Sequence, residues 1–454
     1  MTLKQIENVP EGVCHVCERI RDAGGRALLV GGCVRDLLLG LAPAEWDVEV
    51  FDLASADLES LFPKAMSFVG KGYGIYKFHK LPLDLALPRR ETRHGPGHRD
   101  FFVEIDRYMS IGEAAHRRDF TINAIYYDPL TCVLEDPFGG CKDLRERRLR
   151  HVSDRFSEDP LRVLRGMQFL ARFSLRADPL TVKLCRTLSA DFLSPERIFA
   201  EMRKLFLLGH NIADALAFLD DCDWLRFFPE LEALKTCPQN PAFHPEGCVL
   251  EHIKHALNAF STLRPSVEAD ALAVGFAILC HDFGKPSCTT TDDRGILHAP
   301  GHEKAGIIPT RNFLQRLRAP NFLLEIVPAI VSCHMLPRCF SCMGDEAIPV
   351  TRRLAWRVKR IDLLLAVARC DNMGRPPIVP NFSGEDRLEQ LARTEGILRQ
   401  PPRPIIRGRD LQSHLDMAPS KKMGEILEEL FQAQLDGKFS SAADGLRMAK
   451  KLME

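Results

Sequence analysis

The first 140 or so residues combine short apolar runs with mixed segments, a pattern that predicts a small domain of strands and helices. Residues 26–30 form an apolar run that ends in two glycines, which indicates a strand and a tight turn. Residues 35–40 then begin a helix. Residues 46–51 alternate apolar and polar positions and predict a second strand, and residues 81–87 predict a third.

Beyond about Asp143 the strand pattern fades, and apolar residues recur at helical spacing, as from Leu161 to Leu170. Breaks that contain proline or glycine divide this part; the clearest are residues 194–195, 236–245, 372–386 and 401–409. We therefore expect an α+β protein in which a small mixed-sheet head precedes a mostly helical body. The expected domains are residues 1–140, 141–236, 237–375 and 376–454.

Length and charge narrow the class of protein. The 454 residues suffice for about three domains, and 45% apolar with 27% charged residues is typical of soluble globular proteins. The 61 basic residues balance 61 acidic ones, which argues against an electrostatic nucleic-acid coat or a polybasic membrane binder. A basic groove offset by an acidic surface elsewhere stays open.

The sequence also predicts a cytoplasmic protein that does not associate with a membrane. The longest apolar run, residues 271–280, has ten residues, whereas a membrane span needs about 20. The N-terminal sequence MTLKQIENVPEG lacks the apolar core of a signal peptide. The 15 cysteines are scattered along the chain, which favours a reducing compartment.

Residues suited to phosphate chemistry gather around the glycine turn. Gly31 and Gly32 would let the backbone approach a phosphate, the N-terminus of the next helix favours anions, and Arg35 could add a charged fork. On their own, the two glycines would more often mark a simple strand–helix turn.

Three nearby carboxylates favour a phosphate-binding turn over a simple strand–helix turn. Glu45, Asp47 and Glu49 are two residues apart on the predicted second strand and therefore share one face. A solvated strand face would explain them too, but the neighbouring apolar residues place the strand inside the sheet. Clustered carboxylates beside a phosphate turn are what magnesium-dependent phosphoryl transfer needs. Asp84, on the third strand, could supply a further carboxylate.

Three motifs resemble those of the class II CCA-adding enzymes and bacterial poly(A) polymerases, in the order and spacing of that family. They are Gly31-Gly-Cys-Val-Arg-Asp-Leu-Leu-Leu-Gly40, Arg117-Arg-Asp-Phe-Thr-Ile-Asn-Ala124 and Glu158-Asp-Pro-Leu-Arg-Val-Leu-Arg165. The chain is identified as a member of this nucleotidyltransferase family. The resemblance implies a head of polymerase-β-like fold, Mg²⁺ as its cofactor, ATP and CTP as substrates, and tRNA as a partner.

The resemblance also implies roles for individual residues. The catalytic metal pair of the family falls on Glu45 and Asp47, so the first position is Glu where the family has Asp. Either Glu45 reaches the metal with a shifted backbone, or Glu49 on the same face helps. Asp84 and Arg89 stand where the family places a strand carboxylate and an arginine. The residues implied to contact the nucleotide are Gly31, Gly32, Arg35, Asp36, Arg118, Asp119, Asn123, Asp159, Arg162 and Arg165.

The third motif implies a way to select the incoming base, in the neck at residues 141–236. In the family, Glu158, Asp159 and Arg162 would form an amino-acid template on a helix. A carboxylate acceptor beside a guanidinium donor can pair with the Watson–Crick edge of cytosine or adenine. A helix N-terminus with an ion pair between residues three apart would explain the same residues. Gln168 stands where the family often has Arg.

Histidines are concentrated in the second half of the chain, where seven of the 15 lie between His244 and His334. Imidazoles and carboxylates that converge from separate helices can hold a divalent metal, although a lone histidine is more often a core or surface residue. The ordered set His252, His281-Asp282, His302 and Asp371 resembles the HD phosphohydrolase superfamily.

This second resemblance implies an HD domain at residues 237–375. Its metal ligands would be His252, His281, Asp282 and Asp371, with His302 and His334 contributing to a second metal; the identity of the metal is open. Family precedent is phosphatase or 2′,3′-cyclic phosphodiesterase activity, in which a bound metal activates water against a phosphoester.

The sequence therefore predicts a tRNA nucleotidyltransferase that adds CMP and AMP to tRNA 3′ ends, with an appended HD hydrolase. One alternative keeps the head but makes a poly(A) polymerase, or an enzyme that adds only the terminal A or only the two Cs. In another, the HD domain acts on RNA 3′ phosphates and the head, altered at Glu45, only binds RNA.

Two basic stretches offer a place for RNA. Residues 142–176 hold ten basic and five acidic residues, and residues 351–360 hold five basic residues and no acid. Either stretch could follow an RNA backbone or form a solvated face. Residues 406–431 resemble the tail of the family, which helps to hold RNA, although a plain packing role fits them equally.

Overall fold

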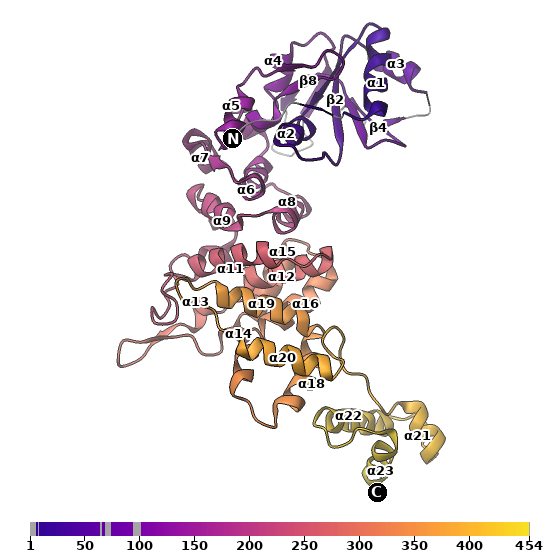
Figure 1. Ribbon diagram of the computed structural model, residues 1–454, viewed down its shortest axis with the longest axis vertical. Helices are drawn as coiled ribbons and strands as arrows, with labels where there is room; N and C mark the ends of the chain where they lie inside the picture. The colour runs from indigo at the N-terminus through magenta and orange to yellow at the C-terminus, as the bar shows by residue number, and fades with distance from the viewer. Residues whose placement is uncertain (1–5, 8, 64–65, 69–73, 94–100, 454) are drawn as a thin grey trace. The chain divides into compact units, whose positions relative to one another are not determined.

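The computed structural model describes residues 6–7, 9–63, 66–68, 74–93 and 101–453 (Figure 1). It divides the chain into two compact units, Met1–Phe227 and Phe228–Glu454, named unit 1 and unit 2 below. Unit 1 contains the large mixed sheet, and unit 2 is built almost entirely of helices. The expected α+β class, with a mixed-sheet head before a helical body, is confirmed.

The elements of unit 1 follow one another as short strands and helices. Its strands are β1 (Arg26–Val30), β2 (Trp46–Phe51), β3 (Met66–Phe68), β4 (Ile75–Phe78), β5 (Leu83–Ala86), β6 (Arg89–Arg93), β7 (Phe101–Ile105), β8 (Tyr126–Asp128), β9 (Val133–Glu135), β10 (Arg148–Leu149) and β11 (Arg176–Ala177). Its helices are α1 (Glu11–Asp22), α2 (Gly32–Leu39), α3 (Ser55–Leu61), α4 (Ile111–Ala115), η1 (Thr121–Asn123), α5 (Gly140–Arg145), η2 (Asp154–Glu158), α6 (Leu161–Phe173), α7 (Pro179–Arg186), α8 (Pro195–Leu208), α9 (Ile212–Asp221) and η3 (Leu225–Phe227).

The main sheet has the strand order β3-β4-β5-β2-β1-β8-β9. β2 runs parallel to β5 and antiparallel to β1, and the register places Asp47 directly opposite Asp84. The expected strands at residues 26–30 and 46–51 coincide with β1 and β2, and the expected strand at residues 81–87 contains β5. The sequence pattern missed β3 and β4, since runs of three or four residues are too short to establish a period of two.

The turn after β1 requires glycine. Gly31 adopts φ +80° and ψ −137°, a conformation that a side chain would strain. α2 begins directly after it at Gly32, three residues before the expected helix start at residue 35. This tight turn brings the N-terminal end of α2 beside β2, against which α2 packs.

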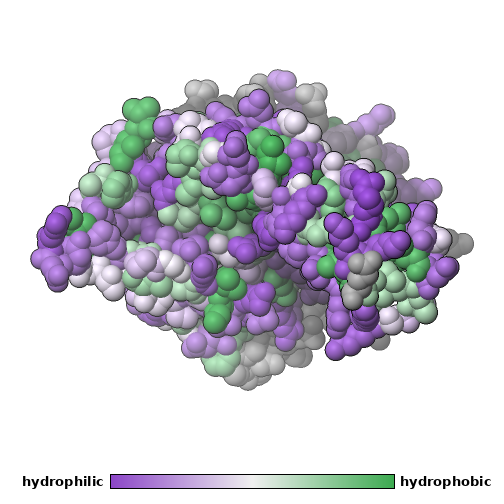
Figure 2. Space-filling view, turned by 90° about the horizontal axis from the view of Figure 1, so that it is seen from below, coloured by the Kyte–Doolittle hydropathy of each residue, from purple (hydrophilic) through white to green (hydrophobic). Residues whose placement is uncertain are grey.

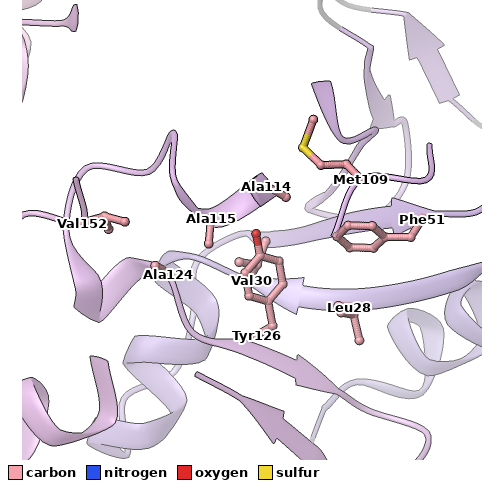
Figure 3. Close-up of a cluster of buried hydrophobic side chains, with 9 residues drawn as sticks. All are labelled: Leu28, Val30, Phe51, Met109, Ala114, Ala115, Ala124, Tyr126 and Val152. Atoms are coloured by element: carbon pink, nitrogen blue, oxygen red, sulfur yellow. The ribbon is translucent and has the colours of Figure 1, made fainter. Parts of the chain in front are cut away.

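A hydrophobic cluster packs α4 against one face of the main sheet (Figure 3). Leu28 and Val30 from β1, Phe51 from β2 and Tyr126 from β8 contribute to it, and Ala114 of α4 is fully buried against them. The small alanine side chains allow the helix backbone to come close to the strands. The cluster holds β1, β2 and β8 in place, and these strands position the candidate site.

Unit 2 is helical apart from a two-stranded hairpin, β12 (Thr290–Thr291) and β13 (Leu297–His298). Its helices are α10 (Pro229–Glu232), α11 (Val249–Leu263), α12 (Glu268–Cys280), α13 (Lys285–Cys288), α14 (His302–Ala305), α15 (Ile307–Arg316), α16 (Asn321–Val331), α17 (Leu336–Cys339), η4 (Phe340–Cys342), α18 (Ala347–Val358), α19 (Ile361–Met373), α20 (Ser383–Thr394), α21 (Gly408–Leu415), α22 (Lys421–Leu435) and α23 (Ala442–Met453).

α12 is the central helix of unit 2. Every residue from Ala271 to Cys280 is buried, and the helix packs against α11, α16 and α19 (Figure 1). A helix that is apolar on all sides belongs in the interior, as the apolar run in the sequence predicted. Its C-terminal end therefore places His281 and Asp282 inside the protein, where both are 1% exposed.

One segment, Asn321–Cys342, is long and apolar enough to cross a membrane, judged by length and composition alone. The sequence pattern did not predict this span. The segment is divided among α16, a turn that carries His334, α17 and η4, and α16 packs against α12 and α15. Its buried residues, such as Leu323, Val327 and Ile330, contribute to the interior of unit 2, whereas Phe322 is exposed.

The C-terminal helices α21, α22 and α23 form a small core of their own, which includes Leu411, Leu430 and Ala449. This core gives the tail a packing role, one of the two roles expected for it.

In Figure 2, separate hydrophobic residues and small groups of them are scattered among hydrophilic residues on the viewed face. Isolated apolar residues of this kind are ordinary on protein surfaces.

Candidate functional sites

A cleft of about 570 Å³ in unit 1 brings most of the expected head residues together. Its lining consists of Gly31, Gly32, Arg35, Glu45, Asp47, Arg117, Arg118, Asp119, Asn123, Asp159, Leu161, Arg162, Arg165, Phe169, Arg197 and Lys204. Five expected residues that the structure describes lie outside this lining: Asp36, Glu49, Asp84, Arg89 and Glu158. The cleft is acidic at β2 and basic along α6 and α8.

Asp47 is the exposed carboxylate at the acidic end of the cleft. A side chain added at Gly31 would lie 3.5 Å from Asp47 Oδ2 and 3.4 Å from Arg118 Nη1, so the glycine turn faces both groups. Desolvation by the cleft walls raises the pKa of Asp47, Arg118 lowers it, and the like charges of Asp84 and Glu45 raise it again. Such mutual repulsion is what a bound cation would relieve.

Asp84 lies beside Asp47 in the register of the sheet but has a cation of its own. Lys77, opposite Asp84 on β4, places its Nζ 2.8 Å from Asp84 Oδ2. Arg89, the other strand residue implied by the resemblance, begins β6 and is not part of the cleft lining. Asp84 therefore contributes negative charge near Asp47 without facing the cleft.

The structure gives Glu49 a different role from the metal ligand that was expected. Its carboxylate is fully buried and accepts hydrogen bonds from Arg117 Nη2 at 2.6 Å, Arg118 Nη2 at 3.0 Å and the Tyr126 hydroxyl at 2.9 Å. Burial alone would raise the pKa of Glu49, but the two guanidinium groups outweigh it and lower that pKa to about 2. Glu49 thus anchors the two arginines that line the cleft.

We expect Glu49→Gln to destabilise unit 1 by about 3 kcal/mol at pH 7, because it leaves two buried guanidinium groups without their counter-charge. Since the pKa of Glu49 is lowered to about 2, the stabilisation is complete above pH 4.5 and is lost as the pH falls from 4.5 to about 2. Hydrogen exchange of the unit 1 backbone amides across this pH range measures the stabilisation. The exposed Glu104→Gln is the control, and a pH-independent difference would contradict the prediction.

Asp36 holds Arg35 in place from outside the lining. Arg35 Nη2 donates to Asp36 Oδ1 at 2.7 Å, and Nη1 donates to Asn123 Oδ1 at 2.7 Å. The guanidinium also stacks over the rings of Phe173 and Phe169, at 4.3 and 5.1 Å from their centroids. These contacts fix the direction of Arg35 toward the glycine turn.

Asp119 joins the second motif to the neck helix α6. Arg165 donates to Asp119 Oδ2 at 2.7 Å, and Asn123 Nδ2 donates to its Oδ1 at 3.0 Å. Burial opposes the charge, but Arg165, Asn123 and Arg162 lower the pKa of Asp119 to about 2. The carboxylate is therefore ionised and fully engaged within the cleft wall.

The third motif forms a turn and not a single helix face. Asp159 precedes the N-cap Pro160, and Arg162 stands in the first turn of α6. The Asp159 carboxylate accepts from the Leu161 N–H at 3.2 Å and pairs with Arg197 of α8 at 2.8 Å. Both side chains still line the cleft, because the turn points them the same way.

Sequence reasoning missed Arg197 and Lys204, which α8 contributes to the cleft. No motif marks them; only their spacing of seven residues, two turns of a helix, places them on one face. Gln168, expected to loosen a contact, is 2% exposed and lies outside the lining. The change from Arg at that position therefore concerns the interior of the neck.

We expect Gly31→Ala to lower nucleotide incorporation at least 10-fold, mainly through a higher KM for the nucleotide. The substitution strains the backbone at φ +80° and inserts a methyl group between Asp47 and Arg118. Gly24→Ala is a matched control, because Gly24 has φ +86° but nothing within 4 Å of its added carbon. Steady-state kinetics compares the two; equal KM values would show that the turn does not face the nucleotide.

In unit 2, six side chains from separate elements converge on one centre. His252 comes from α11, His281 and Asp282 from the end of α12, His302 from α14, His334 from the turn after α16, and Asp371 from α19. Their ligand atoms form three overlapping groups, each within 4.8 Å: His252, His281 and Asp282; His281, His334 and Asp371; Asp282, His302 and His334.

The imidazoles are all oriented in the same way. The Nε2 atoms of His252 and His281 are 3.3 Å apart, as are those of His302 and His334. Each Nδ1 instead lies near an oxygen: 2.9 Å from Glu246 Oε1 for His252, and 2.7–2.8 Å from a backbone carbonyl for His281, His302 and His334. Nδ1 held by an oxygen with Nε2 turned inward is the arrangement of metal-bound histidines.

The donor set fits a divalent metal. Both oxygens of Asp282 lack a hydrogen bond of good geometry, while Lys285 Nζ forms an ion pair with Oδ2 at 2.7 Å. Asp371 Oδ1 is 3.1 Å from His252 Nε2. Burial would raise the pKa of each carboxyl, but the surrounding histidines hold the pKa values of Asp282 and Asp371 well below the ordinary range. Both are therefore ionised, as metal ligands must be.

Two pockets open at this centre, of about 310 and 290 Å³. His334, Arg338, Asp371 and Arg375 line both of them. The sequence did not point to Arg338 or Arg375, although Arg375 ends the same segment that supplies Asp371. Cationic groups beside a metal centre suit a phosphate ester.

The basic stretch at residues 351–360 is largely neutralised. Arg352 Nε pairs with Glu395 at 2.7 Å, Arg353 Nε with Asp436 at 2.9 Å, and Arg360 with Asp270 at 2.7 Å. These ion pairs connect α18 and the start of α19 to other parts of unit 2. Three of the five basic residues in this stretch therefore have a packing role, and contact with an RNA backbone stays a prediction.

Comparison with known proteins identifies the family of the chain. The model of the poly(A) polymerase head domain matches residues 27–150. The multifunctional CCA protein of Xylella fastidiosa (strain 9a5c) is 35% identical over 370 residues, which cover 77% of this chain and 84% of that protein. That of Xanthomonas euvesicatoria pv. vesicatoria (strain 85-10) is 36% identical over 374 residues, covering 80% and 82%.

Solved structures share the fold along the whole chain. The Bacillus stearothermophilus CCA-adding enzyme in complex with CTP has a TM-score of 0.68 and 21% identity, covering 97% of this chain and 96% of its own. The Thermotoga maritima CCA-adding enzyme complexed with tRNA has a TM-score of 0.60 and 17% identity, covering 100% of both chains. This chain therefore belongs to the family of the CCA-adding enzymes, which are tRNA nucleotidyltransferases.

Proposed function

We propose that the cleft of unit 1 adds CMP and AMP to the 3′ end of tRNA, and that the centre of unit 2 hydrolyses phosphoesters. The observation that carries the first part is the meeting of Asp47, the Gly31 turn and the Asp159–Arg162 turn in one cleft. A phosphate site, a carboxylate pair and a base-reading pair are the parts that untemplated nucleotide addition requires.

Asp47 and Glu45 would hold the magnesium of the head. Both carboxylates are exposed at the cleft. Mg²⁺ prefers oxygen ligands, and its charge would relieve the repulsion between the two carboxylates. Bound there, the metal would stabilise charge on the attacking hydroxyl and the departing pyrophosphate. Glu45 would reach inward with its longer side chain, since Glu49 is engaged with Arg117 and Arg118.

The other cleft residues would position the substrates. Arg35, Arg118 and the N–H groups at the start of α2 would bind the triphosphate, with its α-phosphorus turned toward Asp47. The RNA 3′-oxygen then forms a bond to that phosphorus, the bond to pyrophosphate breaks, and the hydroxyl proton passes to solvent. Catalysis of this kind is mostly positioning and charge stabilisation.

Asp159 and Arg162 would read the base. The Asp159 carboxylate can accept from the exocyclic amino group that cytosine and adenine share, and Arg162 can donate to the adjacent ring nitrogen. Uracil and guanine present the opposite pattern. Arg197 would hold Asp159 in position through their 2.8 Å ion pair.

The test is incubation of the full chain with tRNA that lacks its 3′ end and with each labelled nucleotide in turn. We expect CTP to be incorporated first, and ATP only after two C residues. Incorporation of ATP alone would favour a poly(A) polymerase or an A-adding enzyme, and CTP alone would favour a CC-adding enzyme. No incorporation of any nucleotide would contradict the proposal.

In unit 2, the four histidines, Asp282 and Asp371 would hold divalent metal, because their ligand atoms form overlapping groups. Metal bound at this centre would lower the pKa of a water for attack on phosphorus. Lys285, Arg338 and Arg375 would neutralise the phosphate. The RNA 3′ phosphates and cyclic phosphates expected from the sequence are the first substrates to test.

We further propose a cytoplasmic location. All 15 cysteines are free in the structure: eight are buried, four are half-buried and three are exposed. Free thiols throughout a chain fit a reducing compartment.

A further inference from the structure

The two pockets at the centre of unit 2 share four lining residues, and we name them the two lobes of one groove. The first lobe contains Asp282 and His302 of the metal-binding set and extends to the hairpin, where Asn240, Phe243, Leu297 and His298 line it. The second lies by α20 and is lined by Ser341, Ile378, Val379, Asn381 and Ser383. The lobes meet at the four shared residues, His334, Arg338, Asp371 and Arg375, two of which belong to the metal-binding set.

The lobes are similar in size, although the lining of the first is more apolar and that of the second more polar. Their volumes are about 310 and 290 Å³, and each combines amide or hydroxyl groups with an exposed apolar side chain at its rim. In the first lobe that side chain is Phe243, which is 62% exposed; in the second it is Val379, which is 84% exposed. Exposed apolar groups that line a pocket can pack against a planar base or a sugar.

The two arginines at the junction are available for an anion. Arg338 contacts only the sulfur of Met335, at 2.9 Å, and Arg375 donates to the side chain of Asn372 at 2.6 Å. Arg375 Nε is buried without a hydrogen-bond partner. Within the described residues, neither arginine forms an ion pair with a carboxylate. A negatively charged group between the lobes would supply the missing partner.

The shape of the groove discriminates among phosphate esters. A monoester has one substituent on phosphorus, and a 2′,3′-cyclic phosphate carries both ester oxygens on a single ribose, so each would occupy one lobe. A linear phosphodiester has two separate substituents on opposite sides of phosphorus. Only this class would fill both lobes with its phosphate at the metal-binding centre.

We propose that the site in unit 2 acts on linear phosphodiesters, with one nucleoside in each lobe of the groove. The proposal rests on the hydrolytic function proposed above and specifies its substrate as a short single-stranded nucleic acid. In the reaction a water oxygen bonds to phosphorus and one ester P–O bond breaks. The departing alcohol takes up the proton that the water releases, so the products are a monoester and an alcohol.

Hydrolysis by the metal-loaded full chain tests the substrate class. We expect kcat/KM for the dinucleoside monophosphate ApA to exceed that for adenosine 3′-monophosphate at least 10-fold. Ser341→Trp would fill the second lobe and His298→Trp the first; both residues are exposed, so the fold should tolerate the change. Each variant should lower ApA hydrolysis at least 10-fold, whereas only one should affect the monoester. ApA hydrolysis unchanged by both variants would overturn the proposal.

Binding provides a second measurement that does not depend on hydrolysis. In protein treated with a chelator, ApA should protect backbone amides in both residues 240–244 and residues 378–383 from hydrogen exchange, and the monoester only one of them. Protection of the same single lobe by both ligands would overturn the two-lobed arrangement. Hydrolysis of the monoester alone would leave the proposed hydrolytic function intact and refute only the diester substrate.

Discussion

Asp47→Asn is expected to reduce nucleotide incorporation at least about 1,000-fold while leaving the affinity for tRNA nearly unchanged. The substitution keeps the shape of the side chain but removes the charge that the cleft presents beside Gly31 and Arg118. Loss of a metal-binding carboxylate removes about 4 kcal/mol of transition-state stabilisation, which corresponds to that factor. Single-turnover incorporation of labelled CTP measures the chemical step.

Asp52→Asn is the matched control for this substitution. Asp52 follows the same strand, is exposed, and has φ +65°, a conformation that Asn also adopts readily. We expect it to retain full incorporation. If Asp47→Asn also retained normal incorporation, Asp47 could not be the metal-binding carboxylate and the assignment of the head chemistry would fall.

Asp282→Asn is expected to remove the metal of unit 2 and its hydrolytic activity, and to leave CCA addition in unit 1 unchanged. Asp282 belongs to two of the three ligand groups, so its loss weakens the whole set; we expect metal affinity to fall at least about 100-fold. Metal content after dialysis and hydrolysis of a phosphoester give two independent measurements.

The Asp282→Asn variant should keep its fold, because Lys285 retains a hydrogen-bond partner after the substitution. Lys285 Nζ lies 2.7 Å from Asp282 and donates to Gln239 at 2.6 Å, so the ammonium keeps one partner after the substitution. The exposed Asp293→Asn on the hairpin is the control and should keep both metal and hydrolysis. Unchanged metal content and unchanged hydrolysis in Asp282→Asn would show that Asp282 is not a metal ligand.

The sequence predicted the chemistry of the head more securely than its geometry. The glycine turn and the second strand could be predicted because both depend on local pattern: apolar runs, a period of two, and a backbone conformation that only glycine adopts readily. The role of Glu49 could not. Its separation from Asp47 indicates only a shared strand face, whereas its partners Arg117 and Arg118 come from a segment 68 and 69 residues away.

The charge pairing of residues 351–360 also could not be predicted from the sequence. Residues 351–360 hold five basic residues and no acid, yet Arg352, Arg353 and Arg360 pair with acids 43, 83 and 90 residues away. Local charge counts cannot detect a counter-charge that arrives through packing. The same holds for Arg197 and Lys204, which reach the cleft because α8 packs against α6.

Sequence by itself determined the family motifs, their order and the predicted site residues within them, because motifs with fixed spacing and apolar periodicity are local properties of the chain. It identified the carboxylate strand, the neck motif and the histidines that end buried helices. Only the tertiary structure decided that Glu49 anchors arginines, that Asp159 and Arg162 form a turn, and that two pockets meet at one centre. These features depend on contacts between residues far apart in the chain, and such contacts exist only once the apolar faces have packed.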